Sequence, residues 1–448
     1  MKNRIKTYLL LILFISVFTV VTAQQAPAKF SLEEAQQYAM ENSFVLQNTN
    51  MDIAKAQKKV WETITIGLPQ VSGSANFNAF LNLPVSLIPA QFFGGEEGEY
   101  ISVKFGQDYT SDYGIMVSQL LFDGSYIVGI GSSKLYLQLA RQAHEKTEID
   151  IRDAVAQAYY MALVGMENKK VMQDNLSNTQ NLYEETVAYF ENGFREEQDV
   201  DQMKLLVKNA ENEVLKADRE IKISKVVLKY AMGFNLETEI ELTDKLDKFL
   251  GNIFPENTSG GFDMTNHIDY RLSVSNYMAS QKLLNLEKVA FLPSLSAFYN
   301  YSKTAYGNNI NLFKSSVSWF PSSLVGLQLN VPIFSSWQRL SRVSQAKIDL
   351  EKAKNDKILV TQTLQKDYLT ARANLETALE KFSNDAENRN LAEKIKEKTQ
   401  IKFQNGLSGS TELSQIETQY IQSYGSYIGS ALQLLQADLS LKKALGKL

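Results

Sequence analysis

Two acidic side chains behind a repeated turn are the residues of this sequence best placed for chemistry. Asp199 and Glu412 each stand six residues after Gly193 and Gly406, the glycines of two Asn-Gly dipeptides. Glycine in this setting supplies the positive φ at which helices end, so a second helix is expected to begin close to each acid. A carboxylate near a helix start is stabilised by the helix dipole. This structural role is one of two that stay open for the pair.

Enzymatic and metal chemistry have no support in the rest of the chain. It has no cysteine, and its two histidines, His144 and His267, are too far apart in the sequence to suggest a metal pair. No serine-hydrolase, zinc-protease or phosphate-binding motif occurs, so no nucleophile and base can be assigned. We therefore expect no catalytic residue, no metal and no cofactor. The formal net charge of −4 argues against nucleic-acid binding, which favours a basic surface.

The first 23 residues have the composition of an export signal. Lys2, Arg4 and Lys6 precede an apolar run over residues 8–21, and the sequence Val-Thr-Ala at 21–23 fits the small-residue rule for cleavage. We expect residues 1–23 to be removed, which leaves an exported chain whose net charge is more negative.

The exported chain consists of one long unit used twice. The pentapeptide FENGF at 190–194 recurs as FQNGL at 403–407, an offset of 213 residues. Motifs nearer the N-terminus recur at a larger offset, which places about 12 extra residues between 69 and 122 of the first half. Surface loops tolerate such insertions far better than packed helices do. We assign the two repeats to 24–250 and 251–448.

Each repeat contains two segments in which apolar and polar residues alternate, which is the pattern of a half-buried strand. In the clearest one, apolar side chains occupy odd positions from Val71 to Leu83, and most even positions carry serine or asparagine. The expected strands lie at about 70–83, 110–122, 294–306 and 323–334.

Such strands occur in soluble sheets with one buried face and in membrane barrels. A soluble sheet is the commoner case, but the Ser/Asn-rich polar face fits a water-filled lumen. Four strands cannot close an aqueous barrel, whereas three copies of the chain would supply 12 strands. Closure would also leave no open sheet edge in lipid. We therefore favour a trimeric barrel over the soluble sheet.

Long helices are expected between the strands. Residues 338–404 contain neither proline nor glycine, and as a helix they would extend about 100 Å. Spacings of four and three alternate along one seam of this run, as in a coiled coil. The first repeat shows the same spacing from Ile151 to Gly165 and loses it at Lys169. The helical hairpins should turn near 190–200 and 402–413. The seam consists of Leu364, Tyr368, Ala371, Leu375, Ala378 and Phe382.

With these elements in place, the chain resembles the TolC family of outer-membrane efflux proteins. The resemblance rests on short motifs that occur in order, most of them in duplicate. They are FSLEEA at 30–35, the Leu-Pro pairs at 68–69 and 292–293, the strand-to-helix junctions LLFDG and VPIF, the two Asn-Gly turns, and the ends LKYAMG and LKKALG. Each motif alone is weak, but the set covers essentially the whole exported chain.

The resemblance implies an α+β membrane protein: a homotrimer with a 12-stranded β-barrel in outer-membrane lipid and a long 12-helix α-barrel in the periplasm. Residues from about 234 to 262, with the N-terminal segment, would form an equatorial region. The partners would be a periplasmic adaptor and an inner-membrane transporter, in efflux or in type I secretion. A coiled-coil protein of the envelope without a pore is the alternative. The expected adaptor contacts are Asn192, Gly193, Phe194, Asn405, Gly406 and Leu407.

A periplasmic gate is also implied by the resemblance. At the positions of Glu412 and Gln415, family members carry acids that form cation-sensitive rings. Three copies of Glu412 around one pore would attract cations, which is the second role open to this residue. Gln415 interrupts the second ring, so weaker cation block is expected. Asp199 and Gln202 are the first-repeat counterparts.

The links that hold the family's closed state are altered in this chain. The family can use a tyrosine and an arginine at the positions of Phe403 and Ser408, so a hydroxyl and a guanidinium are missing here. Arg195, two residues after the first turn glycine, is expected to substitute by pairing across the tip.

Overall fold

The computed structural model describes residues 28–251, 253 and 262–448, and the expected export signal lies outside them. The chain forms two compact units. The helical unit consists of the segments up to Asn48, from Glu145 to His267 and from Thr363 to Leu448. The sheet unit consists of Thr49–His144 and Ile268–Gln362.

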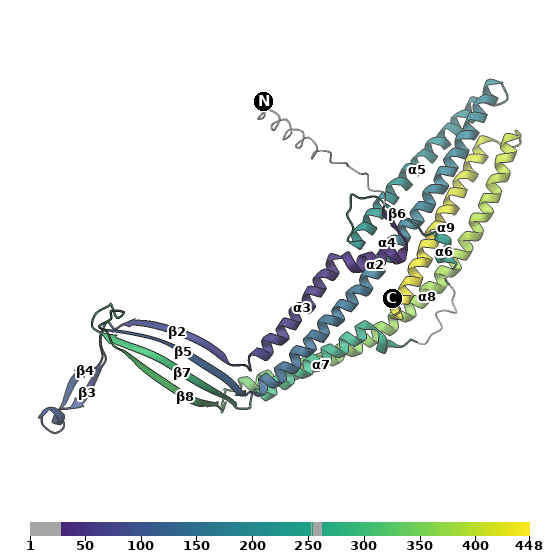
Figure 1. Ribbon diagram of the computed structural model, residues 1–448. Coiled ribbons are helices and arrows are strands. Elements are labelled where there is room, and N and C mark those ends of the chain that lie inside the picture. The colour runs from purple at the N-terminus through teal and green to yellow at the C-terminus, as the bar shows by residue number, and fades with distance from the viewer. Residues whose placement is uncertain (1–27, 252, 254–261) are drawn as a thin grey trace, which may run out of the picture. The chain divides into compact units, whose positions relative to one another are not determined.

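The sheet unit is built on four antiparallel strands in the order β2-β5-β7-β8 (Figure 1). The central pair, β5 and β7, joins the first half of the chain to the second. Strands β2 and β8 are the edges, and no other strand of the described residues pairs with their outer sides. The strands span Gln70–Ala79 (β2), Tyr109–Phe122 (β5), Ser294–Gly307 (β7) and Trp319–Asn330 (β8).

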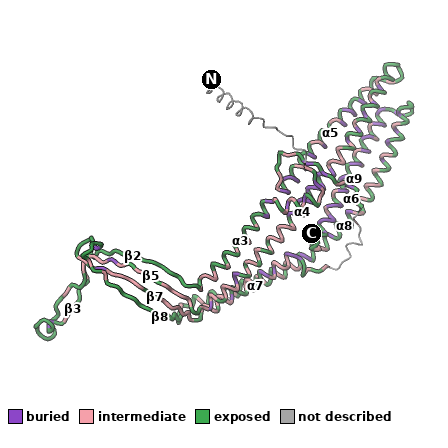
Figure 2. The backbone as a smooth tube through the Cα atoms, viewed as in Figure 1, coloured by how far each residue is buried: buried purple, intermediate pink, exposed green. Residues whose placement is uncertain are grey.

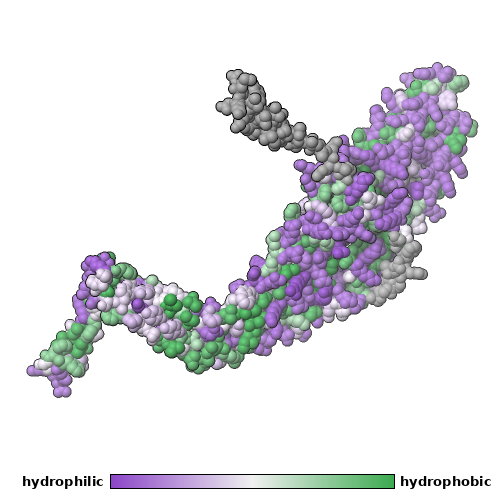
Figure 3. Space-filling view, in the orientation of Figure 1, coloured by the Kyte–Doolittle hydropathy of each residue, from purple (hydrophilic) through white to green (hydrophobic). Residues whose placement is uncertain are grey.

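The register gives this sheet one apolar face and one polar face. A single row across the four strands consists of Val71, Val117, Tyr299 and Val325. The row three residues along β2, on the opposite face, consists of Ser74, Gly114, Ser302 and Ser322. In the space-filling view, hydrophobic residues gather along the sheet at the β8 edge (Figure 3). Other rows are mixed, such as the row of Ser72, Met116, Asn300 and Leu324 on the polar face. The alternation seen in sequence therefore places most, but not all, of the apolar side chains of the sheet on one face.

Two strands end earlier than the sequence pattern indicated. β2 stops at Ala79, next to Phe80, where the alternation has its one exception. β8 stops at Asn330, two residues before Pro332, which has no N–H to donate to a ladder. The C-terminal ends of β2 and β8 therefore coincide with the residues that break the alternation.

The extra residues of the first repeat include a second hairpin of the sheet unit. Strands β3 (Val85–Pro89) and β4 (Tyr100–Lys104) pair with each other, and a short 3₁₀ helix, η1 (Ala90–Phe93), follows β3. The hairpin extends from the end of the sheet at which β2 ends and β5 begins (Figure 1).

Helices flank the strands along the chain. α3 (Phe44–Thr65) precedes β2 and α7 (Ile268–Val289) precedes β7, and α4 (Gly124–Glu191) and α8 (Gln338–Gln404) follow β5 and β8. Helix α7 lies in the sheet unit, whereas α3, α4 and α8 belong partly to each unit. None of the described helices is long and apolar enough to cross a membrane.

The helical unit is a bundle of α4, α5 (Glu197–Met232), α8 and α9 (Ser410–Ala444), and buried residues concentrate in it (Figure 2). Shorter elements pack beside the bundle, and β1 pairs in parallel with β6. They are β1 (Ala28–Phe30), α2 (Leu32–Asn42), β6 (Ile240–Leu242), α6 (Leu246–Leu250) and the 3₁₀ helix η3 (Met264–Asn266).

Tyr159 of α4 links β1 and the segment between β6 and α6 to the bundle. Its hydroxyl donates to Phe30 O at 3.0 Å and lies 3.1 Å from Asp244 Oδ2. Burial raises the pKa of Tyr159 well above its usual range. Both contacts lie in the region that the resemblance assigns to the equator.

The coiled-coil seam of α8 continues beyond Phe382. The same alternation of four and three residues leads through Asp385, Arg389, Ala392 and Lys396 to Thr399 and Phe403, and the last four of these are buried. The seam is therefore continuous, although charged residues hide it in the sequence.

At Lys169, where the first-repeat pattern is lost, the structure has an ion pair between α4 and α5. Lys169 Nζ lies 2.6 Å from Asp218 Oδ1, and Lys222 Nζ lies 2.7 Å from Oδ2. Hydrogen bonds from these two lysines lower the pKa of Asp218 to about 2. A polar link thus takes the place of an apolar contact at this position.

Candidate gate at the helical tips

The turn between α4 and α5 is closed by backbone and asparagine hydrogen bonds. Gly193 has a φ of 78°. Phe194 N–H donates to Tyr189 O at 2.9 Å, and Asn192 Nδ2 donates to Ala188 O at 2.7 Å. The first bond supplies a donor to a carbonyl at the end of α4, and the second adds to the bond from Asn192 N–H to the same Ala188 oxygen.

The turn between α8 and α9 repeats this construction. Gly406 has a φ of 73°, Leu407 N–H donates to Lys402 O at 2.8 Å, and Asn405 Nδ2 donates to Ile401 O at 2.8 Å. The duplicated Asn-Gly sequence therefore folds the same way twice, and the conformation at both glycines is one that other residues rarely adopt.

Each turn presents one large apolar side chain to solvent. Phe194 is 77% exposed and Leu407, its repeat equivalent, is 78% exposed. The two turns therefore present apolar side chains to solvent at equivalent positions.

Arg195 connects the two hairpins within one chain. Its guanidinium donates from Nη2 to the carbonyl oxygen of Phe403, and its Cζ atom lies 4.2 Å from the centre of the Phe403 ring. Asp199 Oδ2 lies 3.8 Å from Nη1 of the same arginine. The predicted pairing of Arg195 across the tip is thus a contact with Phe403, and Asp199 supports it from α5.

Phe403 is also part of a buried apolar cluster directly behind the turns. All four long helices contribute to it, so the cluster joins the hairpins where Arg195 covers them. Its members are Leu182, Met203, Leu206, Phe403 and Leu413.

Glu412 lies in the first turn of α9 and is exposed. The buried Ser408 donates from Oγ to Glu412 Oε2 at 2.7 Å. Asp199 occupies the corresponding first turn of α5. Neither acid is the N-cap residue of its helix, a position that Glu196 and Gly409 occupy, so each acts on the start of its helix only through the helix dipole. Within the described residues, Asp199 and Glu412 form no hydrogen bond with each other; Asp199 pairs with Arg195 and Glu412 with Ser408.

The two glutamines of the predicted gate line one polar cavity between α5 and α9. Gln202 Nε2 lies 3.1 Å from Thr411 Oγ1, and Gln415 lines the same cavity of about 700 Å³ together with Gln419. The lining consists of amides and hydroxyls, which offer both donors and acceptors.

Several buried charged residues of the bundle were not found by sequence reasoning, and two of them form an ion pair with each other. Lys396 and Glu417 form an ion pair behind the tip cluster. Lys396 stands at a seam position of α8, so extending the heptad count beyond Phe382 would have predicted that this lysine faces the interior.

The described fold matches solved outer-membrane channels over nearly its full length. The chain is 15% identical to the CmeC outer membrane channel of Campylobacter jejuni, with a TM-score of 0.71 and coverage of 93% of this chain and 85% of that one. For VceC of Vibrio cholerae the identity is 15%, the TM-score 0.69 and the coverage 93% and 96%. For the open state of the MtrE outer membrane channel of Neisseria gonorrhoeae the identity is 16% and the TM-score 0.71, with coverage of 93% of this chain and 88% of that one. At these identities the likeness establishes the fold.

Sequence comparison identifies the family. No curated protein sequence matches the chain significantly. The outer membrane efflux protein family, however, matches residues 35–234 and 271–447, which is most of both repeats. The chain therefore belongs to the outer membrane efflux protein family.

Proposed function

We propose that three copies of this chain form a passive exit duct, with a 12-stranded barrel in the outer membrane and a 12-helix tunnel in the periplasm. Family and fold are those of outer-membrane efflux channels rather than of enzymes. An inner-membrane transporter and a periplasmic adaptor would supply the substrate and the energy.

The observation that carries the proposal is a sheet with one apolar and one polar face, whose two edge strands, β2 and β8, have no partner strand on their outer sides among the described residues. The apolar row through Val71 and Val325 reaches from one edge strand to the other, and the opposite face is rich in serine. In lipid, unpaired backbone groups along β2 and β8 are too costly to leave open. Pairing β8 of each copy with β2 of the next satisfies both edges and encloses the polar face.

Cysteine crosslinking tests this closure directly, because the natural chain has no cysteine. A Gly73→Cys substitution on β2 would be combined, one at a time, with Ser323→Cys, Val325→Cys or Leu327→Cys on β8. Oxidation should give covalent trimers for the pair that matches the register between copies. As a control, the single Gly73→Cys variant should stay monomeric on denaturing gels. Monomers alone for all three pairs would contradict the closed barrel.

Conductance of the purified protein in planar bilayers tests the channel itself. Discrete conducting steps are expected for the duct, and none for a structural coiled-coil protein of the envelope. The second class of protein would be favoured if trimers formed without conductance.

At the gate, we assign Glu412 to a ring of three carboxylates. Its exposure at the start of α9 supports this position, and the Ser408 hydroxyl bonded to it at 2.7 Å would hold its orientation. Glu412→Gln should weaken block by multivalent cations, and Gln415→Glu should strengthen it. Equal block in all three proteins would assign Glu412 to helix stabilisation alone.

At the tips, the exposed side chains of Phe194 and Leu407 support contact with the adaptor. The double variant Phe194→Ser, Leu407→Ser should lose crosslinking to the adaptor while it keeps its conductance. Retained crosslinking would place the adaptor elsewhere.

A further inference from the structure

Two apolar clusters join the first helical hairpin, α4 and α5, to the second, α8 and α9. The tip cluster includes Leu182 of α4. A larger one, the base cluster, includes Met172 of α4 and Tyr424 of α9. Asn175 of α4 and Glu417 of α9 stand between these clusters along their helices, and both are buried. Polar residues therefore interrupt the apolar contact between the hairpins at one level of the bundle.

At this level, Lys396 of α8 reaches across to the first hairpin. Its Nζ atom donates to Asn175 Oδ1 at 2.9 Å. The same ammonium lies 3.3 Å from Glu417 Oε2 and 4.3 Å from the centre of the Tyr420 ring. Gln400 donates from Nε2 to Glu417 Oε1 at 2.6 Å. Of these partners only Asn175 belongs to the first hairpin, since the others lie on α8 and α9.

This distribution of partners decides what a separation of the hairpins would cost. Lys396 and Glu417 would move together with the second hairpin, so neither buried charge would lose its counter-ion. The bond from Lys396 to Asn175 would break, and water would hydrate both groups in exchange. The separation would thus cost one charge-assisted hydrogen bond and leave no charge unpaired, which suits a contact that opens and closes repeatedly.

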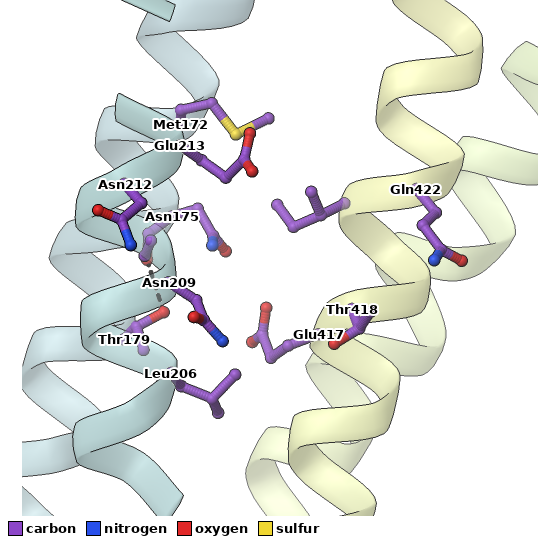
Figure 4. A pocket seen from close by; sticks show the side chains of 12 residues that line it. Met172, Asn175, Thr179, Leu206, Asn209, Asn212, Glu213, Glu417, Thr418 and Gln422 are labelled. Atoms are coloured by element: carbon purple, nitrogen blue, oxygen red, sulfur yellow. Dashed lines mark hydrogen bonds between the residues drawn. The ribbon is translucent and has the colours of Figure 1, made fainter. Parts of the chain in front are cut away.

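Cavities on two sides of this level leave the hairpins in contact along a narrow strip. One cavity of about 430 Å³ lies between α4, α5 and α9, and Asn175 and Glu417 line it from the two hairpins (Figure 4). Another of about 440 Å³ lies between α4 and α8, and its lining includes Asn178 and Glu397. Because protein interiors are normally packed without such voids, little apolar packing at this level opposes separation.

We propose that Lys396 is a positioning residue of the entrance, which holds the closed state through Asn175 and marks the depth to which the hairpins separate. This inference rests on the proposed gate at the tips. The hairpins would part from the turns as far as Asn175 and stay joined by the base cluster. Arg195 would hold the outermost contact and Lys396 the innermost one.

The accessibility of buried thiols tests the proposal in the detergent-solubilised full-length protein, because the natural chain has no cysteine. Thr186→Cys places one reporter on α4 at a residue that is 1% exposed, one turn from Leu182 of the tip cluster. Ser430→Cys places the other on α9 at a residue that is 0% exposed, two residues from Ile428 of the base cluster. A maleimide reacts with either thiol when the surrounding structure opens, so its rate measures the open population.

Asn175→Leu removes the acceptor and keeps a side chain of similar size. It should raise the labelling rate of the Thr186→Cys reporter about tenfold, which corresponds to about 1.4 kcal/mol. The rate of the Ser430→Cys reporter should not change, because the base cluster stays closed. Gln173→Leu, which replaces an exposed amide of α4 that lines neither cavity, should alter neither rate.

A double-mutant cycle assigns the effect to Lys396. Lys396→Met combined with Glu417→Gln removes both buried charges and keeps Asn175. In this background Asn175→Leu should no longer raise the rate, since residues that act through one bond have non-additive effects.

Three results would each overturn the proposal: an unchanged rate in Asn175→Leu, equal rises at both reporters, or a rise that persists in the background without Lys396. Equal rises would mean a general loss of stability. The labelling needs no conductance, so its failure would leave the proposed channel function intact. Conversely, a natural protein without conductance would contradict the channel without changing these rates.

Discussion

Removing the side chain of Arg195 should favour the open entrance. In the structure its guanidinium donates to the Phe403 carbonyl, lies over the Phe403 ring at 4.2 Å and is mostly buried. If the hairpins separate on opening, all of these contacts are lost. Arg195→Ala removes them from the closed state only, so the change acts on the equilibrium between the two states.

The size of the effect follows from the contacts. A hydrogen bond that involves a charged group contributes about 1.5–3 kcal/mol, and a partly buried cation–π contact contributes about 0.5–2 kcal/mol. The pair with Asp199, at 3.8 Å, adds little. A total of about 2–5 kcal/mol corresponds to a shift of roughly 30-fold to 5,000-fold in the ratio of open to closed entrances.

Single-channel recording in planar bilayers measures this shift as a rise in mean conductance. Arg195→Lys should give an intermediate rise, because lysine keeps the charge but not the planar fork of the guanidinium. Lys208→Ala, which removes an exposed pair with Glu211 on the same helix, should change nothing. If Arg195→Ala conducts like the natural protein, the contact with Phe403 does not hold the entrance closed.

Three further outcomes concern the stability of the helical unit. Gly406→Ala should lower the free energy of unfolding, measured by thermal unfolding, by about 1–2 kcal/mol, because a left-handed φ is strained for alanine. Gly409→Ala, at a φ of −85°, should lower it far less. Equal decreases in the two variants would refute the strain argument. Tyr159→Phe should lower the stability by about 1–3 kcal/mol through the loss of buried hydrogen bonds, and Tyr230→Phe, on an exposed residue, serves as its control. Because the folded pKa of Asp218 is lowered from 3.8 to about 2, its ion pairs stabilise the fold above pH 4, and that stability is lost as the pH falls toward 2. Acid unfolding of Asp218→Asn should lack this component, and identical acid profiles would argue against it.

Local signals in the sequence predicted the elements, and non-local packing decided the site. The run without proline or glycine at 338–404 is the helix α8, residue for residue, since helix continuity depends on local residue types. The pairing of β5 with β7 joins segments nearly 200 residues apart, and no local pattern specifies it. For the same reason the sequence predicted that Arg195 pairs across the tip but not with which residue. The structure identifies the acceptor as the carbonyl oxygen of Phe403.

Polar residues at interior positions mark the limit of pattern reading. The seam of α8 was followed to Phe382 because its residues are apolar that far, although the helix keeps the same register to Phe403. Lys396 lies in that register, and it is buried because Asn175 and Glu417, on two other helices, supply its acceptors. Only the assembled bundle brings those three residues together, so a sequence window around any one of them cannot show the pair.

Sequence differences between the two repeats explain why two turns of the same backbone conformation make different side-chain contacts. Phe190 and Phe403 are repeat equivalents, as are Arg195 and Ser408. Arg195 covers Phe403, which is 3% exposed, whereas the hydroxyl of Ser408 is too short to cover Phe190, which is 40% exposed. Instead, Ser408 is bonded to Glu412. One repeat therefore supplies the residue that joins the hairpins, and the other supplies the residue that positions an exposed acid. Two equal tips could do one of these tasks twice, whereas the difference between Arg195 and Ser408 lets the two tips do both.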